Sequence, residues 1–129
     1  MRNARIAIVL IGLALPYVAR LPRGMGWLKQ YTDTGFEGWL LLGAFNAIAW
    51  GAILAISFTY RRPVSLIAPC LFGFGYLAWV HGNFDLSAGA QAAIALIFIP
   101  IYALKPIVIG GAMGYIVDRM LRRDDADAA

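Results

Sequence analysis

The chain has 129 residues, of which 61% are hydrophobic and only 14% are charged, and its mean hydropathy is +0.71. A soluble domain is usually about 45–50% apolar with about a quarter of its residues charged, so this composition excludes an ordinary soluble domain. The formal net charge of +4 does not indicate nucleic-acid binding, because the basic residues flank apolar segments and form no single patch. We expect an all-α integral membrane protein with one membrane domain over residues 1–129.

The first apolar segment covers residues 6–20 and follows Arg2 and Arg5. A basic start before a short apolar stretch also describes a signal peptide, but Tyr17 stands where a cleavage site needs a small residue. We therefore expect a retained first helix, although its ~15 residues cover only ~22 Å of a ~30 Å hydrocarbon core. Residues 21–38 mix helix-breaking residues with aromatic and charged ones, which predicts an amphipathic outer loop; the alternative is a substrate or partner site.

The next two spans are predicted over residues 39–60 and 64–80, with a tight turn at Arg61 and Arg62 between them. Residues 39–60 are uncharged and have an aromatic residue at each end, as is typical of a membrane span. Cys70, the only cysteine, lies in the third segment. We expect it to be a buried, unreactive thiol, and neither a disulfide nor a cysteine metal site is possible within the chain.

The last apolar stretch, residues 88–117, carries one charge, Lys105, and two prolines, Pro100 and Pro106. A straight helix of this length would be ~45 Å long, which is too long for one span and too short for two. We expect one long, proline-kinked helix that crosses over about residues 90–117, with one end outside the bilayer. Residues 119–129 should form a frayed polar tail.

The distribution of basic residues predicts that both termini face the cytoplasm, since this orientation puts seven basic residues inside and three outside. The inner set is Arg2, Arg5, Arg61, Arg62, Arg119, Arg122 and Arg123, and the outer set is Arg20, Arg23 and Lys29. We expect a multi-pass protein of a bacterial inner membrane.

Lys105 is the first candidate for a functional residue, because a charge inside an apolar span costs roughly 2.5–3.5 kcal/mol on insertion scales. Its depth depends on how the helix is placed in the bilayer. If Asp118 lies at the inner surface, Lys105 is ~20 Å away from that surface and deep in the core. If Gln91 instead lies at the outer surface, the Lys105 side chain can snorkel to the inner surface. Pro106 frees the carbonyl of Tyr102, which could pair with the ammonium. A structural role and a role in a transport path or partner contact both remain open.

Asn46 and a stripe of small residues at Gly43, Ala47 and Gly51 predict close helix packing in the second span, with ligand binding by Asn46 as the alternative. The partner helix could be internal or belong to another chain. Gly110 and Gly114 give a second, weaker packing signal.

His81 and Asp85 stand four residues apart, but Gly82 and Asn83 between them should end the helix. We expect a solvated outer loop, the alternative being a pH-sensing or proton-relay pair. A lone histidine without further ligands is a poor metal site, and the chain lacks a nucleophile elbow and a phosphate-binding glycine loop.

The sequence therefore favours a non-enzymatic accessory, regulatory or immunity-type protein that contacts another membrane protein through its helices. We expect no cofactor, no metal and no nucleic acid, and partners limited to the lipid bilayer, another membrane protein or further copies of the chain. The alternative is a small oligomeric transporter or channel, for an anionic solute, that uses Lys105.

Overall fold

The computed structural model describes residues 1–33, 35–89 and 91–128, and all regular structure in them is helical. The helices are α1 (Arg2–Val18), η1 (Leu21–Arg23), α2 (Met25–Thr32), α3 (Gly35–Ser57), η2 (Pro63–Leu66), α4 (Ile67–Asn83) and α5 (Ala92–Ala128). Within the described residues, four stretches are long and apolar enough to cross a membrane: α1 with η1, α3, η2 with α4, and α5. The prediction of an all-helical chain with four candidate membrane spans is therefore confirmed.

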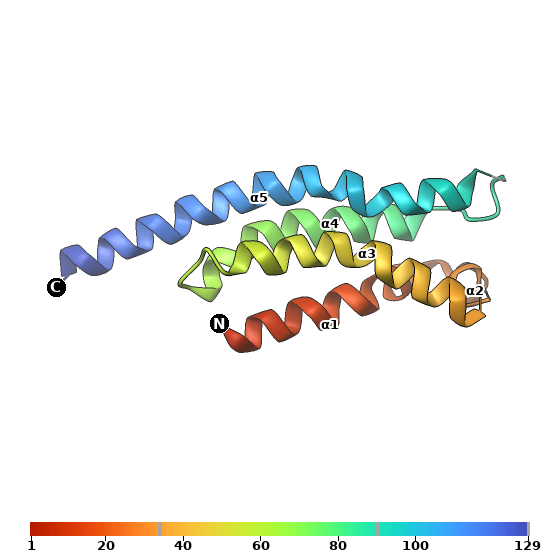
Figure 1. The fold of residues 1–129 in the computed structure, drawn as a ribbon, viewed down its shortest axis with the longest axis horizontal. Helices are drawn as coiled ribbons and strands as arrows, with labels where there is room; N and C mark the ends of the chain where they lie inside the picture. The colour runs from red at the N-terminus through yellow and green to blue at the C-terminus, as the bar shows by residue number, and fades with distance from the viewer. Residues whose placement is uncertain (34, 90, 129) are drawn as a thin grey trace.

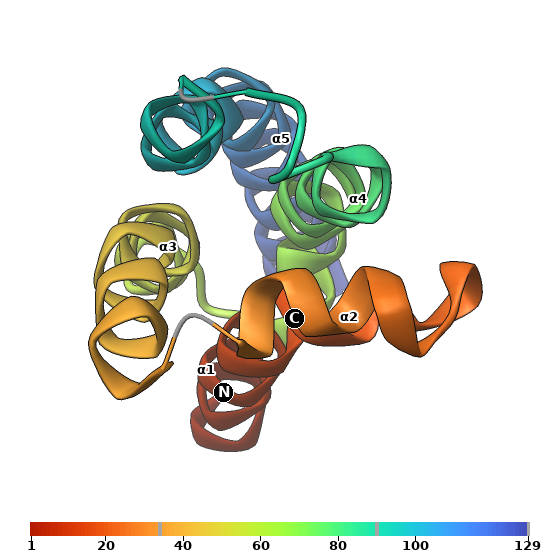
Figure 2. The ribbon, with the colours of Figure 1, turned by 90° about the vertical axis from the view of Figure 1, so that its right-hand side faces the viewer.

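The four long helices lie side by side as a bundle (Figure 1). Viewed along its length, α3 and α4 lie on opposite sides, as do α1 and α5 (Figure 2). Accordingly α5 packs on α4 and α3, and α1 packs on α3 and α4. Both termini and the turn over residues 58–62 lie at one end of the bundle, the terminal end. The short helix α2 and residues 84–89 lie at the other, the α2 end.

The core lies where the four helices face one another. Its buried apolar side chains come from all of the long helices, and they include Ile8, Ala49, Ile53, Leu77, Phe74, Ile99, Ala103 and Ile107. Glycine allows the helices to approach closely at several points: a Cβ built on Gly73 would lie 2.7 Å from Ile107 and 2.9 Å from Ile53. The two glycines predicted to pack, Gly110 and Gly114, do so against the segment that contains Ser65 and Ala68.

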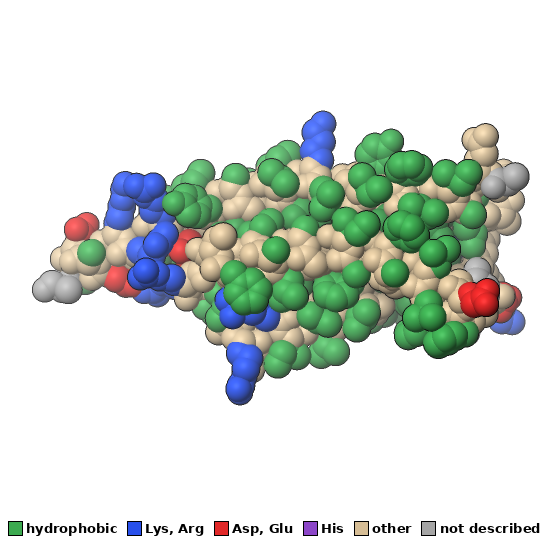
Figure 3. Space-filling view, viewed as in Figure 1, with side chains coloured by type: hydrophobic (Ala, Val, Ile, Leu, Met, Phe, Trp, Pro, Cys, Tyr) green, Lys and Arg blue, Asp and Glu red, His purple; other side chains and the backbone are tan. Residues whose placement is uncertain are grey.

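The outer surface between the two ends is apolar, as a lipid-facing surface is. Large hydrophobic side chains of all four long helices are exposed. On the face shown in Figure 3, acidic and basic side chains gather at the ends, and one basic side chain stands out from the apolar middle. This distribution indicates a multi-pass membrane protein in contact with the lipid bilayer.

Some helices extend beyond their predicted bounds, because the polar flanks continue the helical backbone. The helix predicted to end near residue 80 runs to Asn83, whose side-chain amide donates to the Trp79 carbonyl 2.8 Å away. The tail over residues 119–129, expected to fray, is helical through Ala128. Thus α5 has 37 residues and is ~55 Å long, and its last turns extend past the other helices (Figure 1). Within the predicted outer loop the chain forms η1 and α2.

Candidate functional site

A buried arginine organises the α2 end of the bundle. Arg20 lies between α1 and η1, two residues after the end of α1, and is fully buried. Its Nη1 donates to the carbonyls of His81, at 2.9 Å, and Phe84, at 2.7 Å, so the guanidinium satisfies carbonyls left free at the end of α4. Its Nε donates to the Trp27 carbonyl at 2.8 Å and its Nη2 to Gln30 Oε1 at 2.7 Å. One side chain thus joins α1, α2 and α4.

Aromatic rings complete this arginine cluster. The Arg20 guanidinium lies 3.9 Å from the ring centroid of Tyr31 and 4.5 Å from that of Trp27. The Trp27 indole N–H donates to the Gly82 carbonyl at 2.9 Å. Burial raises the pKa of the Tyr31 phenol, which therefore stays neutral at physiological pH. The Arg20 guanidinium is thus surrounded by neutral side chains and backbone carbonyls, and this arrangement stabilises the packing of the helices.

The structure does not bring His81 and Asp85 together as a pair. His81 lies within α4 and is fully buried, and its Nδ1 is 2.8 Å from the Tyr31 hydroxyl. The expected solvated loop is wrong for His81, because Gly82 does not end the helix. A Cβ built there would lie 2.9 Å from the Ala19 carbonyl oxygen, so the glycine instead admits the backbone that follows α1.

Asp85, in contrast, lies in the turn that follows α4. Its Oδ1 accepts from the Ser87 backbone N–H at 3.0 Å, from the Ser87 hydroxyl at 2.7 Å and from Gln30 Nε2 at 3.1 Å. The hydrogen bonds from Ser87 are the main reason why the pKa of Asp85 lies below its usual value. Gln30 thereby connects Asp85 to Arg20, and the turn is held to α2.

A buried carboxylate organises the terminal end. Asp118 of α5 is fully buried, and its Oδ1 accepts from the backbone N–H groups of Arg61, at 3.0 Å, and Arg62, at 3.1 Å, and from the Ser65 hydroxyl, at 2.9 Å. Arg122, one turn later in α5, forms an ion pair with its other oxygen at 3.3 Å. The carboxylate therefore binds the backbone just before η2 and the Ser65 side chain, and it holds the turn between α3 and α4 against α5.

Asn46 joins two helices at mid-span. Pro16 has no backbone N–H, so it leaves the carbonyl of Gly12 in α1 without its helical partner. Asn46 Nδ2 of α3 donates to that carbonyl at 2.9 Å, and the Asn46 side chain is only 3% exposed. Because Gly12 has no side chain, Trp50 lies directly over it. Asn46 thus has an internal packing role, as one predicted alternative requires.

The small-residue stripe beside Asn46 is not used inside the bundle. Among the described residues, nothing lies within 4 Å of a Cβ built on Gly43 or on Gly51. Gly12, Gly73, Gly110 and Gly114 differ from them, since a Cβ on any of these would overlap a neighbour. Ala47 lies between the two stripe glycines in sequence and is partly exposed. The stripe therefore faces outward.

A groove of about 370 Å³ runs between α1 and α3 next to this stripe. Its rim includes exposed Leu13, Leu40 and Ala44, so it opens to the lipid-facing surface. Three residues that line it also carry a buried polar atom without a hydrogen-bond partner among the described residues, namely Asn46 Oδ1, Trp50 Nε1 and the Tyr17 hydroxyl, and these atoms are closed off from the groove itself. In a hydrocarbon environment such atoms are costly unless something supplies a partner.

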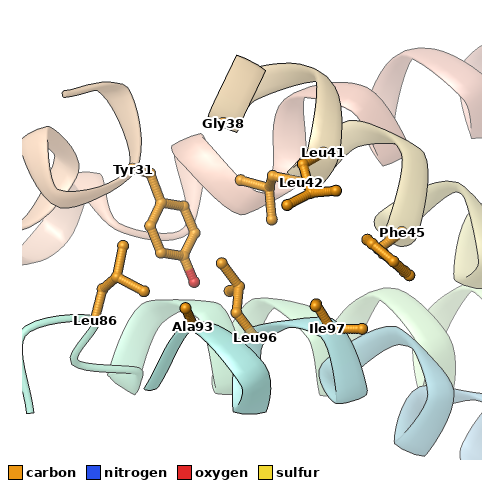
Figure 4. Close-up of a pocket in the computed structure, with 9 residues that line it drawn as sticks. All are labelled: Tyr31, Gly38, Leu41, Leu42, Phe45, Leu86, Ala93, Leu96 and Ile97. Carbon is orange, nitrogen blue, oxygen red and sulfur yellow. The ribbon is translucent and has the colours of Figure 1, made fainter. Parts of the chain in front are cut away.

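A second, smaller pocket of about 130 Å³ lies between α3 and α5 near the α2 end. Leu42, Phe45, Leu96 and Ile97 give it an apolar wall, and the Tyr31 ring lies at one end (Figure 4). The Tyr31 hydroxyl is already engaged by His81 Nδ1 of α4. Such a pocket suits an apolar group and offers few polar contacts for a substrate.

Lys105 lies on the outer face of α5 and is exposed. It is the only charged residue of α5 before Asp118. Tyr102, one turn earlier, is also exposed, and Pro106 leaves the Tyr102 carbonyl without a helical N–H. Phe98, Tyr102, Lys105 and Ile109 have the spacing of one helix face, the outer α5 face. Lys105 therefore does not line the inside of a single bundle.

Sequence reasoning missed the two residues that organise the bundle ends. Arg20 was considered only as one of the outer basic residues, and Asp118 served only to mark a membrane surface. The aromatic residues Trp27 and Tyr31, seven and eleven positions after Arg20, were the available signal for a buried cation. Among the described residues, no group of three or more His, Cys, Asp or Glu side chains could hold a metal ion.

Comparison of the chain with protein-family models, with curated protein sequences and with solved structures finds no match. The class of protein therefore follows from the fold and its surface: an all-helical, multi-pass membrane protein with four candidate spans.

Proposed function

We propose that the chain is a non-enzymatic accessory, regulatory or immunity-type membrane protein that acts through helix–helix contacts with another membrane protein. The observation that carries this proposal is the unoccupied small-residue stripe of α3. Gly43 and Gly51 have no described neighbour within 4 Å of an added Cβ, whereas four other glycines of the bundle are closely packed. Small residues at such spacing allow a second helix to approach closely in a membrane.

The polar clusters support the same proposal. Arg20 and Asp118 are each surrounded by hydrogen-bond partners that connect helices, so their charges are used within the fold. A substrate site would instead need polar groups that converge on an accessible pocket. The pocket between α3 and α5 is lined almost entirely by apolar side chains.

We propose further that the terminal end faces the cytoplasm of a bacterial inner membrane. The termini and the 58–62 turn share that end (Figure 1), and the basic residues near them outnumber those near the α2 end. In a Cys70→Ala background, Asp33→Cys should react with an impermeant thiol reagent from outside. Labelling of Asp33→Cys only after permeabilisation would overturn this orientation.

The stripe is tested by adding bulk at its centre. Ala47→Leu should abolish co-purification of the partner while the isolated protein keeps its helical content and melting temperature, because the side chain is partly exposed. Ile48→Leu, an exposed neighbour on the same helix, is the matched control. Equal effects of the two substitutions would show that the stripe is not an interface.

The exposed position of Lys105 favours a second candidate function, a small oligomeric transporter or channel for an anionic solute. In an oligomer, this cation could line a path between copies. Lys105→Met should then reduce anion flux into reconstituted liposomes while leaving assembly intact. Wild-type liposomes without flux under any gradient would exclude this candidate.

A further inference from the structure

A hollow of about 450 Å³, which we call the basic hollow, lies on the last turns of α5 at the terminal end of the bundle (Figure 1). Three of the five residues that line it are arginines and none is acidic: Tyr115, Arg119, Arg122, Arg123 and Ala126. Tyr115, Arg119 and Arg123 are exposed, so the hollow is accessible from outside the bundle.

Two of the three arginines carry a charge that no described carboxylate neutralises. Arg122 forms an ion pair with the buried Asp118 at 3.3 Å. Arg119 and Arg123 form no ion pair with any described residue, although Asp127 follows Arg123 by one turn. The basic hollow therefore holds two guanidinium groups whose charge an anionic ligand could balance.

A neighbouring hollow at the same end differs in this respect. Its lining consists of Arg61, Arg62, Arg122 and Asp125. Asp125 forms an ion pair with Arg62, so this second hollow already contains an anion. Of the two, the basic hollow is the one that attracts an anion from outside.

The basic hollow begins at the level of the bundle end. Asp118, the residue before Arg119, accepts from the backbone N–H of Arg61 at 3.0 Å, and Arg61 belongs to the 58–62 turn. Arg119 is therefore level with the turn that joins two candidate spans. Such a turn belongs at the membrane surface, where lipid phosphates lie.

The same side of α5 continues toward the middle of the bundle as an apolar strip. Exposed residues spaced by three or four positions form one helix face, and in this part of α5 they are Val108, Ala112, Tyr115 and Arg119. The face is apolar at Val108, amphipathic at Tyr115 and basic at Arg119, which is the order expected across a membrane interface. Val108 and Arg119 are ~17 Å apart along the helix, close to the ~15 Å of hydrocarbon in one leaflet.

We propose that the basic hollow binds the phosphate headgroup of an anionic phospholipid, and that one acyl chain of this lipid lies along the apolar strip. The guanidinium groups of Arg119 and Arg123 donate to the phosphate oxygens, whose geometry matches that of a planar guanidinium. A zwitterionic lipid carries its own ammonium group, so the two uncompensated guanidinium groups favour a lipid with a net negative charge. Basic clusters next to a membrane span attract such lipids.

Native mass spectrometry of the full chain in detergent micelles, over a range of lipid concentrations, tests the proposal. Wild type should bind its first molecule of dioleoylphosphatidylglycerol more tightly than dioleoylphosphatidylcholine, which has the same acyl chains. Arg119→Gln and Arg123→Gln should each weaken the binding of phosphatidylglycerol about 5-fold, the factor expected for one basic residue near an anionic lipid. Equal affinities of wild type for the two lipids would overturn the inference.

Arg2→Gln is the matched control, since Arg2 is exposed at the same end but belongs to α1 and lies outside the basic hollow. It should leave the affinity for the first phosphatidylglycerol molecule unchanged. An equal loss in Arg2→Gln would show that the lipid responds only to the overall charge of this end, and it would overturn the site. All three variants should melt like wild type in micelles without phosphatidylglycerol, because none of the three arginines forms an ion pair with a described residue.

Competition distinguishes a lipid from a soluble phosphate. Inorganic phosphate and glycerol 3-phosphate carry the anion without acyl chains, so they cannot occupy the apolar strip and should not displace phosphatidylglycerol. Displacement by either compound at a similar concentration would overturn the assignment to a lipid. The inference goes beyond the proposed accessory role and does not depend on it. Partner binding is tested by Ala47→Leu on α3, so either proposal can fail without the other.

Discussion

Replacement of Arg20 by methionine should strongly destabilise the bundle. The substitution keeps an unbranched apolar stem but removes the Arg20 donor from the carbonyls of His81, Phe84 and Trp27. It also removes one of two donors to the Gln30 amide oxygen, which still accepts from the Leu86 backbone N–H. Each acceptor left unpaired in a buried position costs about 1–3 kcal/mol. The effects are not additive, and water can reach acceptors at the membrane surface, so we expect a total loss of about 3–5 kcal/mol.

Arg23→Met provides the matched control, since it changes the same residue type in the same way three positions later. Arg23 is exposed, and its guanidinium lies 5.0 Å from the Trp27 ring centroid, a contact that contributes only about 0.5–1 kcal/mol. The assay is reversible unfolding in mixed micelles followed by circular dichroism, with the free energy of unfolding compared among wild type and both variants. Equal losses for the two variants would refute the argument that the Arg20 hydrogen bonds hold the α2 end together.

Three further predictions concern other parts of the bundle. Asp118→Asn should lower the free energy of unfolding by about 1.5–3 kcal/mol, because the charge that strengthens the hydrogen bonds of Asp118 is lost. Asp124→Asn, at an exposed site, should have little effect in the same unfolding assay. Gly114→Ala should lower the melting temperature, because the added Cβ would lie 2.3 Å from a backbone oxygen; Gly75→Ala, with nothing described within 4 Å, should be neutral or slightly stabilising. The pKa of Asp85 is lowered in the folded protein, so its contribution to stability is present above its unfolded-state pKa and is lost as pH falls through the folded-state value. The hydrogen-exchange protection factors of amides in residues 84–89, taken relative to the intrinsic rate at each pH, should therefore fall at acid pH, and Asp85→Asn should remove this dependence.

The four candidate spans could be predicted because membrane insertion is governed by local sequence. An uncharged run such as residues 39–60 has no low-energy alternative to a helix in hydrocarbon. The helix ends were predicted less accurately. A polar residue such as Asn83 can extend a helix when its side chain forms a hydrogen bond within that helix. Lys105 could be assigned to a span but not to a face, because a helix with apolar residues on all sides gives no periodic signal.

The polar clusters could not be predicted because their partners are distant in sequence. The Arg20 guanidinium reaches carbonyls 61 and 64 residues away, and Asp118 reaches backbone N–H groups 57 and 56 residues away. Every residue has the same backbone groups, so no pattern of side chains in the sequence predicts these hydrogen bonds. The bond between Asn46 and Gly12 was closer to prediction, since both an intramembrane amide and a proline that frees a carbonyl are visible in the sequence.

The distance along the chain between Arg20 and its acceptors also sets an order of events during synthesis. The carbonyls of His81 and Phe84 emerge from the ribosome more than sixty residues after Arg20, which takes roughly 3–13 s at about 5–20 residues per second. Throughout that interval the Arg20 guanidinium has no acceptors from α4, and water can accept the hydrogen bonds that those carbonyls will later accept. The α2 end of the bundle can therefore close around Arg20 only after the first three candidate spans have been synthesised.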